Sequence, residues 1–179
     1  FDISNIQGNE SVAAMVVFKD GAPAPEAYRR FRIRGVTGID DYASLQEVVK
    51  RRFLRGRKEQ EEGVANPGFL PFPDLMVIDG GKGQLSAVCT VLADLNCTDQ
   101  PVISLAEREE EVFRPGMAEP LRIPRDDHAL HLLQQLRDEA HRFALTFHRS
   151  RRQKQQFTSV LDQIKGVGPK RKKALLQKF

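Results

Sequence analysis

Apolar residues in the first third of the chain follow two different periods. Short runs that are apolar, or that alternate with charged residues, are typical of β-strands, and here they are separated by the turn residues Gly8-Asn9-Glu10 and Asp20-Gly21. The strands expected from these runs cover residues 1–6, 11–19 and 28–34. From Asp40 to about Arg55 the apolar positions recur every three or four residues, which predicts an amphipathic helix. A β-meander followed by a helix is therefore expected.

The rest of the chain predicts two further strands, a hairpin and two helices. Residues 56–73 hold glycine, charges and three prolines and are expected to form a long loop. A wholly apolar run at 75–78 is typical of a strand buried on both faces of a sheet, and residues 101–106 repeat the strand pattern. The remaining expected elements are a helix over 84–95, a hairpin around Pro115-Gly116 and a long helix over 126–148.

This order of elements indicates a mixed α/β fold. Antiparallel strands, a helix, and then parallel strands separated by a helix and closed by a final helix follow the order of the ribonuclease H-like fold. By that analogy the sheet has five strands in the order 3-2-1-4-5, flanked by helices, and its first strand lies beside the strand that ends at Asp79. We expect this domain to cover residues 1–152, with residues 153–179 as a separate tail.

Composition narrows the class of protein. A chain of 179 residues with 40% apolar content can bury a core, and it has no apolar run long enough for a membrane span or a secretion signal. Cys89 and Cys97 form neither a disulfide framework nor a zinc motif, so a cytoplasmic protein is expected. Residues 149–179 hold ten Lys and Arg against one acid, whereas residues 1–148 hold 18 basic against 23 acidic side chains. Such a basic block predicts a phosphate-binding arm or, alternatively, a solvated basic helix.

Two carboxylates stand where a hard metal ion could bind. Asp2 lies between Phe1 and Ile3, so that its side chain points to the opposite face of an apolar strand, and Asp79 ends the apolar run before Gly80-Gly81. Converging carboxylate oxygens suit Mg²⁺ in a centre that hydrolyses phosphodiesters. Alternatively, Asp2 is an exposed acid of an edge strand, and Asp79 accepts backbone N–H bonds in a turn.

Three other residues could complete such a centre. Lys82 follows the double glycine. The segment lacks the GK[ST] ending of a nucleotide-binding loop, so no nucleotide cofactor is expected. The lysine could instead contact a DNA phosphate. His141 shares a helix face with Arg137 and could bind a metal or carry a proton, or it could simply be structural. Asp41 opens the first long helix together with Asp40, and the two could be an N-cap pair.

The tail contains a Gly-Val-Gly-Pro segment between two stretches of helical character. Its backbone N–H groups and the following basic residues could hold a DNA phosphate without reading bases. The residues concerned are Gly166, Gly168, Lys170, Arg171 and Lys172. An ordinary helix-turn-helix with a solvated basic surface is the alternative.

Five ordered motifs resemble the C-terminal half of the UvrC family, the nuclease subunits of the bacterial UvrABC excision-repair system. These motifs are Phe1-Asp2-Ile3-Ser4, residues 38–43 (Gly-Ile-Asp-Asp-Tyr-Ala), residues 77–84 (Val-Ile-Asp-Gly-Gly-Lys-Gly-Gln), residues 137–141 (Arg-Asp-Glu-Ala-His) and residues 166–170 (Gly-Val-Gly-Pro-Lys). The resemblance covers essentially the whole chain. It implies a ribonuclease H-like endonuclease that cuts damaged double-stranded DNA on the five-prime side of a lesion with Mg²⁺ or Mn²⁺.

The resemblance also implies roles for single residues. Asp2, Asp79 and His141 would be the catalytic and metal-binding triad, Asp41 a further acidic position, and Lys82 a supporting phosphate contact. The family acts on a UvrB–DNA complex, yet the segment that docks on UvrB is absent here, and the tail holds only part of a helix-hairpin-helix region. A non-catalytic nucleic-acid-binding scaffold and a junction resolvase of the same fold remain the rival interpretations.

Overall fold

A computed structural model describes most of the chain. It describes the backbone of residues 1–6, 10–36, 38–107 and 110–163 together with 168, 171 and 174, and the side chains of all of these except 4–6, 10, 11 and 147–163. Two compact units, Phe1–Ala144 and Leu145–Phe179, make up the chain. The boundary expected at residue 152 remains a prediction. No helix in this described part is both long and apolar enough to cross a bilayer.

The first sheet contains three antiparallel strands in the order β1-β2-β5. These strands are β1 (Asp2–Ile6), β2 (Glu10–Met15) and β5 (Arg29–Arg32). Asp2 pairs with Ala14, and Ala14 pairs with Arg30. The side chains of these three residues therefore project from the same face of the sheet.

The strand expected over residues 11–19 is shorter than predicted. It ends at Met15, and the chain then forms a separate hairpin of β3 (Phe18–Lys19) and β4 (Ala22–Pro23), followed by the 3₁₀ turn η1 (Pro25–Ala27). Asp20 and Gly21 both have positive φ, 50° and 76°, which is the conformation of a tight two-residue hairpin turn. The Asp-Gly pair therefore closes a local hairpin instead of returning the chain directly to the main sheet.

The second sheet contains four strands in the order β6-β7-β8-β9. These strands are β6 (Met76–Asp79), β7 (Val102–Ala106), β8 (Glu111–Phe113) and β9 (Leu121–Arg122). The pair β6-β7 is parallel and the other two pairs are antiparallel. The hairpin expected around Pro115-Gly116 is confirmed by the pairing of β8 with β9.

Two backbone hydrogen bonds join the start of the first sheet to the second. The Phe1 nitrogen donates to the Val77 carbonyl at 2.8 Å, and the Asp79 N–H donates to the Phe1 carbonyl at 2.9 Å. This alternation is the pattern of a parallel strand pair. The described strands nevertheless form sheets of three and four strands, so the single five-stranded sheet remains a prediction.

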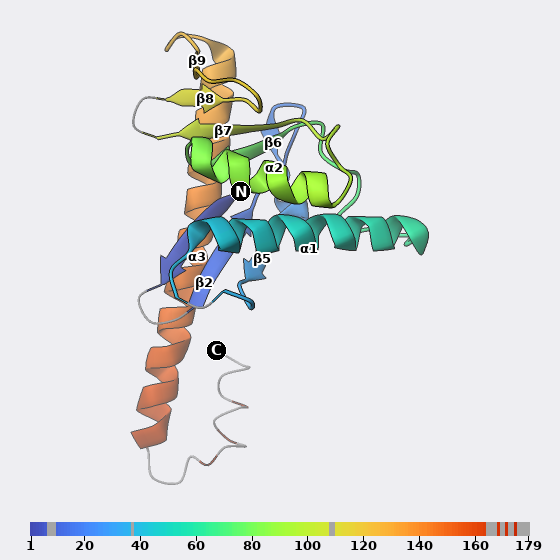
Figure 1. The fold of residues 1–179 in the computed structure, drawn as a ribbon. Helices are drawn as coiled ribbons and strands as arrows, with labels where there is room; N and C mark the ends of the chain where they lie inside the picture. The colour runs from blue at the N-terminus through green and yellow to red at the C-terminus, as the bar shows by residue number, and fades with distance from the viewer. Residues whose placement is uncertain are drawn as a thin grey trace. The chain divides into compact units, whose positions relative to one another are not determined.

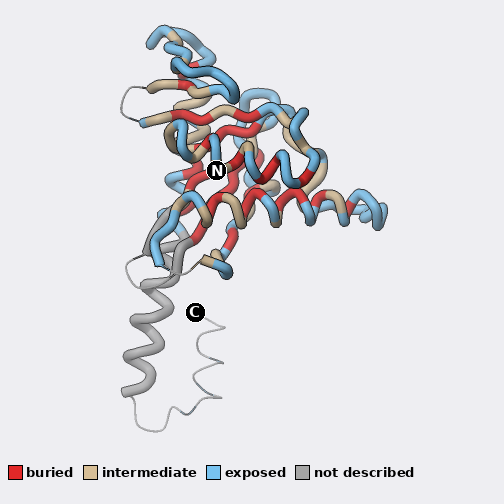
Figure 2. The backbone as a smooth tube through the Cα atoms, viewed as in Figure 1, coloured by how far each residue is buried: buried red, intermediate tan, exposed pale blue. Residues whose placement is uncertain are grey.

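Helices cover both faces of the strands in the first unit. Figure 1 shows α1 (Asp41–Glu61) and α2 (Lys82–Asp94) on one face, and on the other face the part of α3 (His128–Gln163) that belongs to this unit, up to Ala144. The main core lies beneath α1 and α2, where the buried side of each helix meets the strands (Figure 2). Its largest buried members include Phe53, Leu45, Met76 and Ile78. A smaller cluster beneath α3 contains Val16, Tyr28 and Ala140.

The first helix continues beyond the expected end near Arg55. Gly56, the first residue of the expected loop, is buried within α1, where a β-carbon would lie only 2.8 Å from the ring of Phe72. Phe72 itself stacks on Phe53 with ring centroids 5.3 Å apart. The glycine therefore serves close packing of the 62–75 segment on the helix and does not end it.

Neighbouring positions on α1 give a test of this core. Phe53 is buried and Leu54 is 47% exposed. We expect Phe53→Ala to lower the free energy of unfolding by roughly 3–5 kcal/mol, because it removes a buried ring and leaves a cavity. Leu54→Ala should change it by less than about 0.5 kcal/mol. Urea denaturation of both variants measures the difference, and equal losses would contradict the assignment of the core.

Candidate active site

Asp2 lies where strand alternation predicts. Phe1 and Ile3 pack in or against the main core, whereas the Asp2 side chain projects from the α3 face and is only 8% exposed. Its strand neighbour Ala14 is fully buried. The alternative of an exposed edge-strand acid is therefore wrong. A carboxylate held this far from water favours a nearby cation or hydrogen-bond donors.

Asp79 ends β6 beside Asp2. Its backbone N–H bonds to the Phe1 carbonyl, so the residue that precedes Asp2 fixes its position. Burial, and then the negative charge of Asp2, raise the pKa of the Asp79 carboxyl above its ordinary value, while Arg137 acts in the opposite direction. The two carboxylates therefore share one poorly solvated place and repel each other.

Helix α3 brings an imidazole to the same place. Nδ1 of His141 lies 3.7 Å from Oδ2 of Asp2, and the His141 side chain is 61% exposed. One turn earlier, the guanidinium of Arg137 bonds to Glu110 at 3.2 Å and to Asp138 at 3.0 Å. The arrangement thus has a solvent-facing histidine above a buried acid, with an arginine near the second acid.

Glycines shape the turn that follows Asp79. Gly80 has a φ of 139°, and a β-carbon there would lie 2.8 Å from the Gln84 side chain. That side chain folds back and accepts the Gly81 N–H at 3.1 Å. The exposed Lys82 opens α2, and its ammonium donates to the Ala118 carbonyl at 3.3 Å. Lys82 therefore begins α2 directly after the turn, three residues along the chain from Asp79.

The two acids at the start of α1 have different roles in the structure. Asp40 is the N-cap, and its Oδ1 accepts the Ala43 N–H at 2.9 Å. Asp41 is the first helical residue and is partly buried. The capping interpretation therefore holds for Asp40, and a site role for Asp41 remains a prediction.

Most of the predicted tail site lies outside the described residues. Gly166, Lys170 and Lys172 belong to this undescribed part. Gly168 and Arg171 are described, and both are exposed. The DNA-binding role of the five tail residues remains a prediction.

Sequence reasoning missed an acid near the site. Glu107 follows β7 and raises the pKa of Asp79, as Asp2 does more strongly. The signal was present, because the apolar run that forms β7 ends at this acid just as the run in β6 ends at Asp79. Glu110, which pairs with Arg137, carried no comparable signal because it lies within a charged stretch.

The donors present suit a hard cation bound partly by water. Among the described side chains, no group of three or more from His, Cys, Asp and Glu is placed so that it could hold a metal ion. Two carboxylates with an exposed imidazole beside one of them leave several positions of an octahedral ion to water and phosphate, which is how Mg²⁺ commonly binds. These residues therefore fit a divalent cation at an open site better than a metal enclosed by protein.

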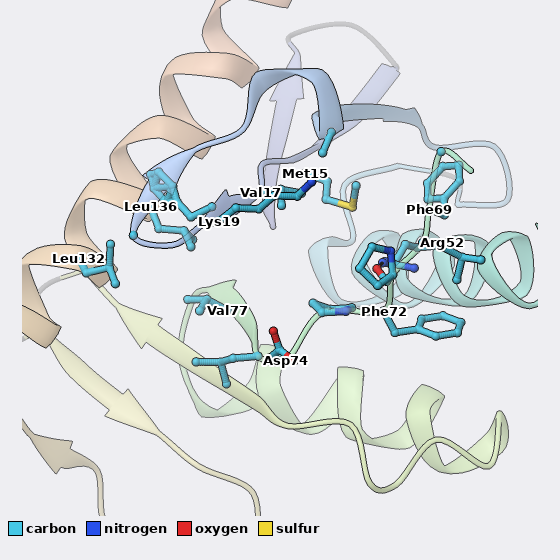
Figure 3. Close-up of a pocket in the computed structure, with 18 of the residues that line it drawn as sticks. Met15, Val17, Lys19, Arg52, Phe69, Phe72, Asp74, Val77, Leu132 and Leu136 are labelled. Carbon is cyan, nitrogen blue, oxygen red and sulfur yellow. Dashed lines mark hydrogen bonds between the residues drawn. The ribbon is translucent and has the colours of Figure 1, made fainter. Parts of the chain in front are cut away.

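A nearby cavity is distinct from this site. It has a volume of about 340 Å³ and is bordered by Met15, Val17, Val77 and Leu136, with Arg52 and Phe72 on another side (Figure 3). Asp2, Asp79 and His141 are absent from its lining. The cavity is therefore separate from the place where these three side chains lie.

Comparison with known proteins shows consistent similarity. Residues 1–145 match the family described as the UvrC RNAse H endonuclease domain. The whole chain is 52% identical to a UvrABC system protein C from Moorella thermoacetica, 52% to one from Gloeobacter violaceus and 51% to one from Dehalococcoides mccartyi. The chain spans 28–29% of the length of these relatives.

The raised pKa of Asp79 gives a pH-dependent test. The pKa of Asp79 is higher in the folded chain than in the unfolded chain, so the ionised carboxylate lowers the free energy of unfolding at any pH above its folded pKa. This loss of stability disappears below the ordinary pKa of 3.8, where the carboxyl is protonated in both states. Without divalent ions, Asp79→Asn should therefore raise the melting temperature at pH 7, and the gain should shrink as the pH falls toward 3.8. Thermal unfolding across this range measures it. Asp99→Asn, at an exposed position, is the control, and an equal gain in both variants would contradict the coupling.

Proposed function

This chain belongs to the UvrC RNAse H endonuclease domain family, and we propose that it makes the five-prime incision in damaged DNA during bacterial nucleotide excision repair. The observation that carries the proposal is the pair of neighbouring, poorly solvated carboxylates with an imidazole 3.7 Å from one of them. Such an arrangement suits in-line attack of water on a phosphodiester. The relatives named UvrABC system protein C support the assignment to excision repair.

Asp2 and Asp79 are the proposed ligands of Mg²⁺ or Mn²⁺. A bound cation would reduce the repulsion between these two carboxylates, which gives the pair a physical reason to bind one. When bound, a divalent ion supplies a water of lowered pKa and stabilises charge on the phosphate oxygens. The two backbone hydrogen bonds at Phe1, which hold Asp2 and Asp79 on neighbouring segments, support this assignment.

His141 and Lys82 complete the proposed chemistry. The exposed imidazole can accept a proton from the attacking water or complete the ligand set, because a neutral imidazole has one unprotonated ring nitrogen. Lys82 is the first residue of α2. Its ammonium can contact a substrate phosphate once its hydrogen bond to the Ala118 carbonyl is broken. Asp41 is proposed as a further acidic residue.

A continuous sheet underlies this proposal. In the order β5-β2-β1-β6-β7, which corresponds to the predicted 3-2-1-4-5, β1 and β6 are central neighbours. The two hydrogen bonds at Phe1 support this order. Central parallel strands are the most rigid place from which to present two carboxylates, because backbone pairing restrains both edges of each strand.

The proposed substrate and partner are larger than this chain. Damaged double-stranded DNA, presented by UvrB, would meet the Asp2–Asp79 edge, while the basic residues of the tail hold the phosphate backbone in the manner of a helix-hairpin-helix. Residues 149–179 carry ten Lys and Arg, which favours phosphate contact. A cytoplasmic location fits this substrate.

Replacing either carboxylate tests the catalytic assignment. We expect Asp2→Ala and Asp79→Ala to abolish the five-prime cut of a lesion-containing duplex in the complete repair system, and to leave DNA affinity nearly intact. Both should also remove the rise in melting temperature that Mg²⁺ gives the native chain, because a ligand that binds only the folded state stabilises it. Asp99→Ala should retain both properties. Continued cutting by either site variant rejects the assignment.

Salt dependence tests the tail. The double variant Lys170→Ala with Arg171→Ala should bind DNA more weakly, and its plot of log affinity against log salt should be shallower by nearly two, about 0.9 for each lost phosphate contact. Fluorescence anisotropy from 50 to about 200 mM salt measures this slope. Lys50→Ala with Lys58→Ala, on exposed positions of α1, is the matched control. An unchanged slope in the tail variant removes these residues from the interface.

A further inference from the structure

Two apolar side chains at the start of α1 are unusually exposed. Ile39 is 81% exposed and Tyr42 is 50% exposed, and both belong to the segment just before and within the first turn of the helix. Ile39 directly precedes the N-cap, a position from which an apolar residue often packs against the first helical turn. Its exposure shows that it makes no such packing here. The core therefore does not account for this pair.

Tyr42 lies against the turn that follows Asp79. A β-carbon at Gly83 would lie 2.7 Å from the Tyr42 hydroxyl and 2.8 Å from its ring, so only glycine lets the ring rest on the first turn of α2. One side of the ring is thereby supported, and half of the side chain stays open to solvent. The ring is a rigid, half-exposed aromatic surface held in place by backbone.

This surface lies close to the proposed catalytic carboxylates. Gly83 is four residues after Asp79, so their Cα atoms are at most roughly 14 Å apart even for a fully extended chain. Successive nucleotides of one strand advance about 3.4 Å along a duplex axis, so this span covers about four nucleotides. The exposed Lys82 lies between the two residues in sequence and adds a positive charge. A DNA strand at Asp79 can therefore reach Tyr42.

We propose that Tyr42 and Ile39 form a contact surface for the DNA strand being cut, in which the tyrosine ring stacks on a base within a few nucleotides of the scissile phosphate. This inference rests on the proposed endonuclease function. An aromatic ring accepts any base, because every base has a flat apolar face, and Ile39 extends the same surface. The contact therefore holds the strand without reading its sequence and assists a site that itself contacts only phosphate.

Tryptophan fluorescence tests the stacking directly. The chain contains no tryptophan, so Tyr42→Trp introduces a single reporter. We expect single-stranded oligothymidylate to quench its emission, whereas an abasic strand of equal length and charge should leave it nearly unchanged. Leu54→Trp is the control, since Leu54 is similarly exposed on the same helix but roughly 18 Å along it. Equal quenching by both strands, or equal quenching of both variants, overturns the proposal.

Affinity measurements give the second test. Tyr42→Ala should weaken binding of oligothymidylate about tenfold, which corresponds to the loss of one stacked base, whereas Tyr42→Phe should bind almost as the native chain does. Ile39→Ser should weaken binding less than Tyr42→Ala. If Tyr42→Ala lowers the melting temperature but retains native affinity, the ring is only a packing contact on Gly83 and the proposal fails.

One further variant separates this proposal from the catalytic one. Asp79→Ala combined with Tyr42→Trp should lose cutting but keep the base-dependent quenching. If cutting persists in this variant, the proposed endonuclease centre is wrong whatever the quenching shows. If cutting is lost and base-dependent quenching is also absent from Tyr42→Trp alone, only the stacking surface is wrong.

Discussion

The proximity of two carboxylates, the buried Asp2 and the half-buried Asp79, is the constraint on which the proposed site depends. Asp2 and Asp79 carry the same charge on adjacent strands, and burial makes that charge costly, as the raised pKa of Asp79 shows. Two backbone hydrogen bonds at Phe1 prevent the strands from separating to relieve it. The folded chain therefore keeps two like charges close together, which lowers its stability where both carboxylates are ionised.

The position of α3 decides whether an imidazole joins the pair. Ala140 and Ala144 are buried, and such small residues let the helix approach the sheet closely. Tyr28 packs edge-on against Phe143 at 5.1 Å, and the Arg30 guanidinium lies 4.1 Å above the same ring. These contacts hold one side of the helix, so that His141, on another side, stays exposed near Asp2. Aromatic packing around Phe143 therefore helps to position this part of α3.

Backbone shape connects the acidic pair to the surface where a substrate would arrive. Gly80, with its positive φ, lets the chain turn sharply after Asp79, and Gln84 closes the turn onto Gly81. Gly83 then leaves room for the Tyr42 ring. Gly80 and Gly83 thus each have a separate structural reason, and the segment they belong to brings Asp79, Lys82 and the Tyr42 ring near one another. A nucleotide-binding loop requires none of this arrangement.

Local sequence pattern determined much of this protein. The alternation around Asp2, the apolar run before Asp79 and the helical period after Asp40 predicted the strands and helices in the right order, and they identified the two acids. The predicted ends of these elements were wrong where packing between residues that are distant in the sequence outweighs the local preference for a helix end or a strand. Gly56 does not end α1 because Phe72 needs its space, and the strand through Met15 ends early because Asp20-Gly21 closes its own hairpin.

Charge and contact between distant segments were decided by the tertiary structure alone. Glu107 and Arg137 shift the pKa of Asp79 only because separate strands and a helix meet there. The position of the exposed Tyr42 ring is likewise known only from its contact with Gly83. A repeat of apolar residues every two or 3.6 positions indicates which side of a strand or helix is buried. It does not indicate which other strand or helix lies against that side. The sequence by itself therefore determined the chemical groups and the helices and strands that carry them. Folding determined which of these groups meet, because charges and rings interact through space and not along the chain.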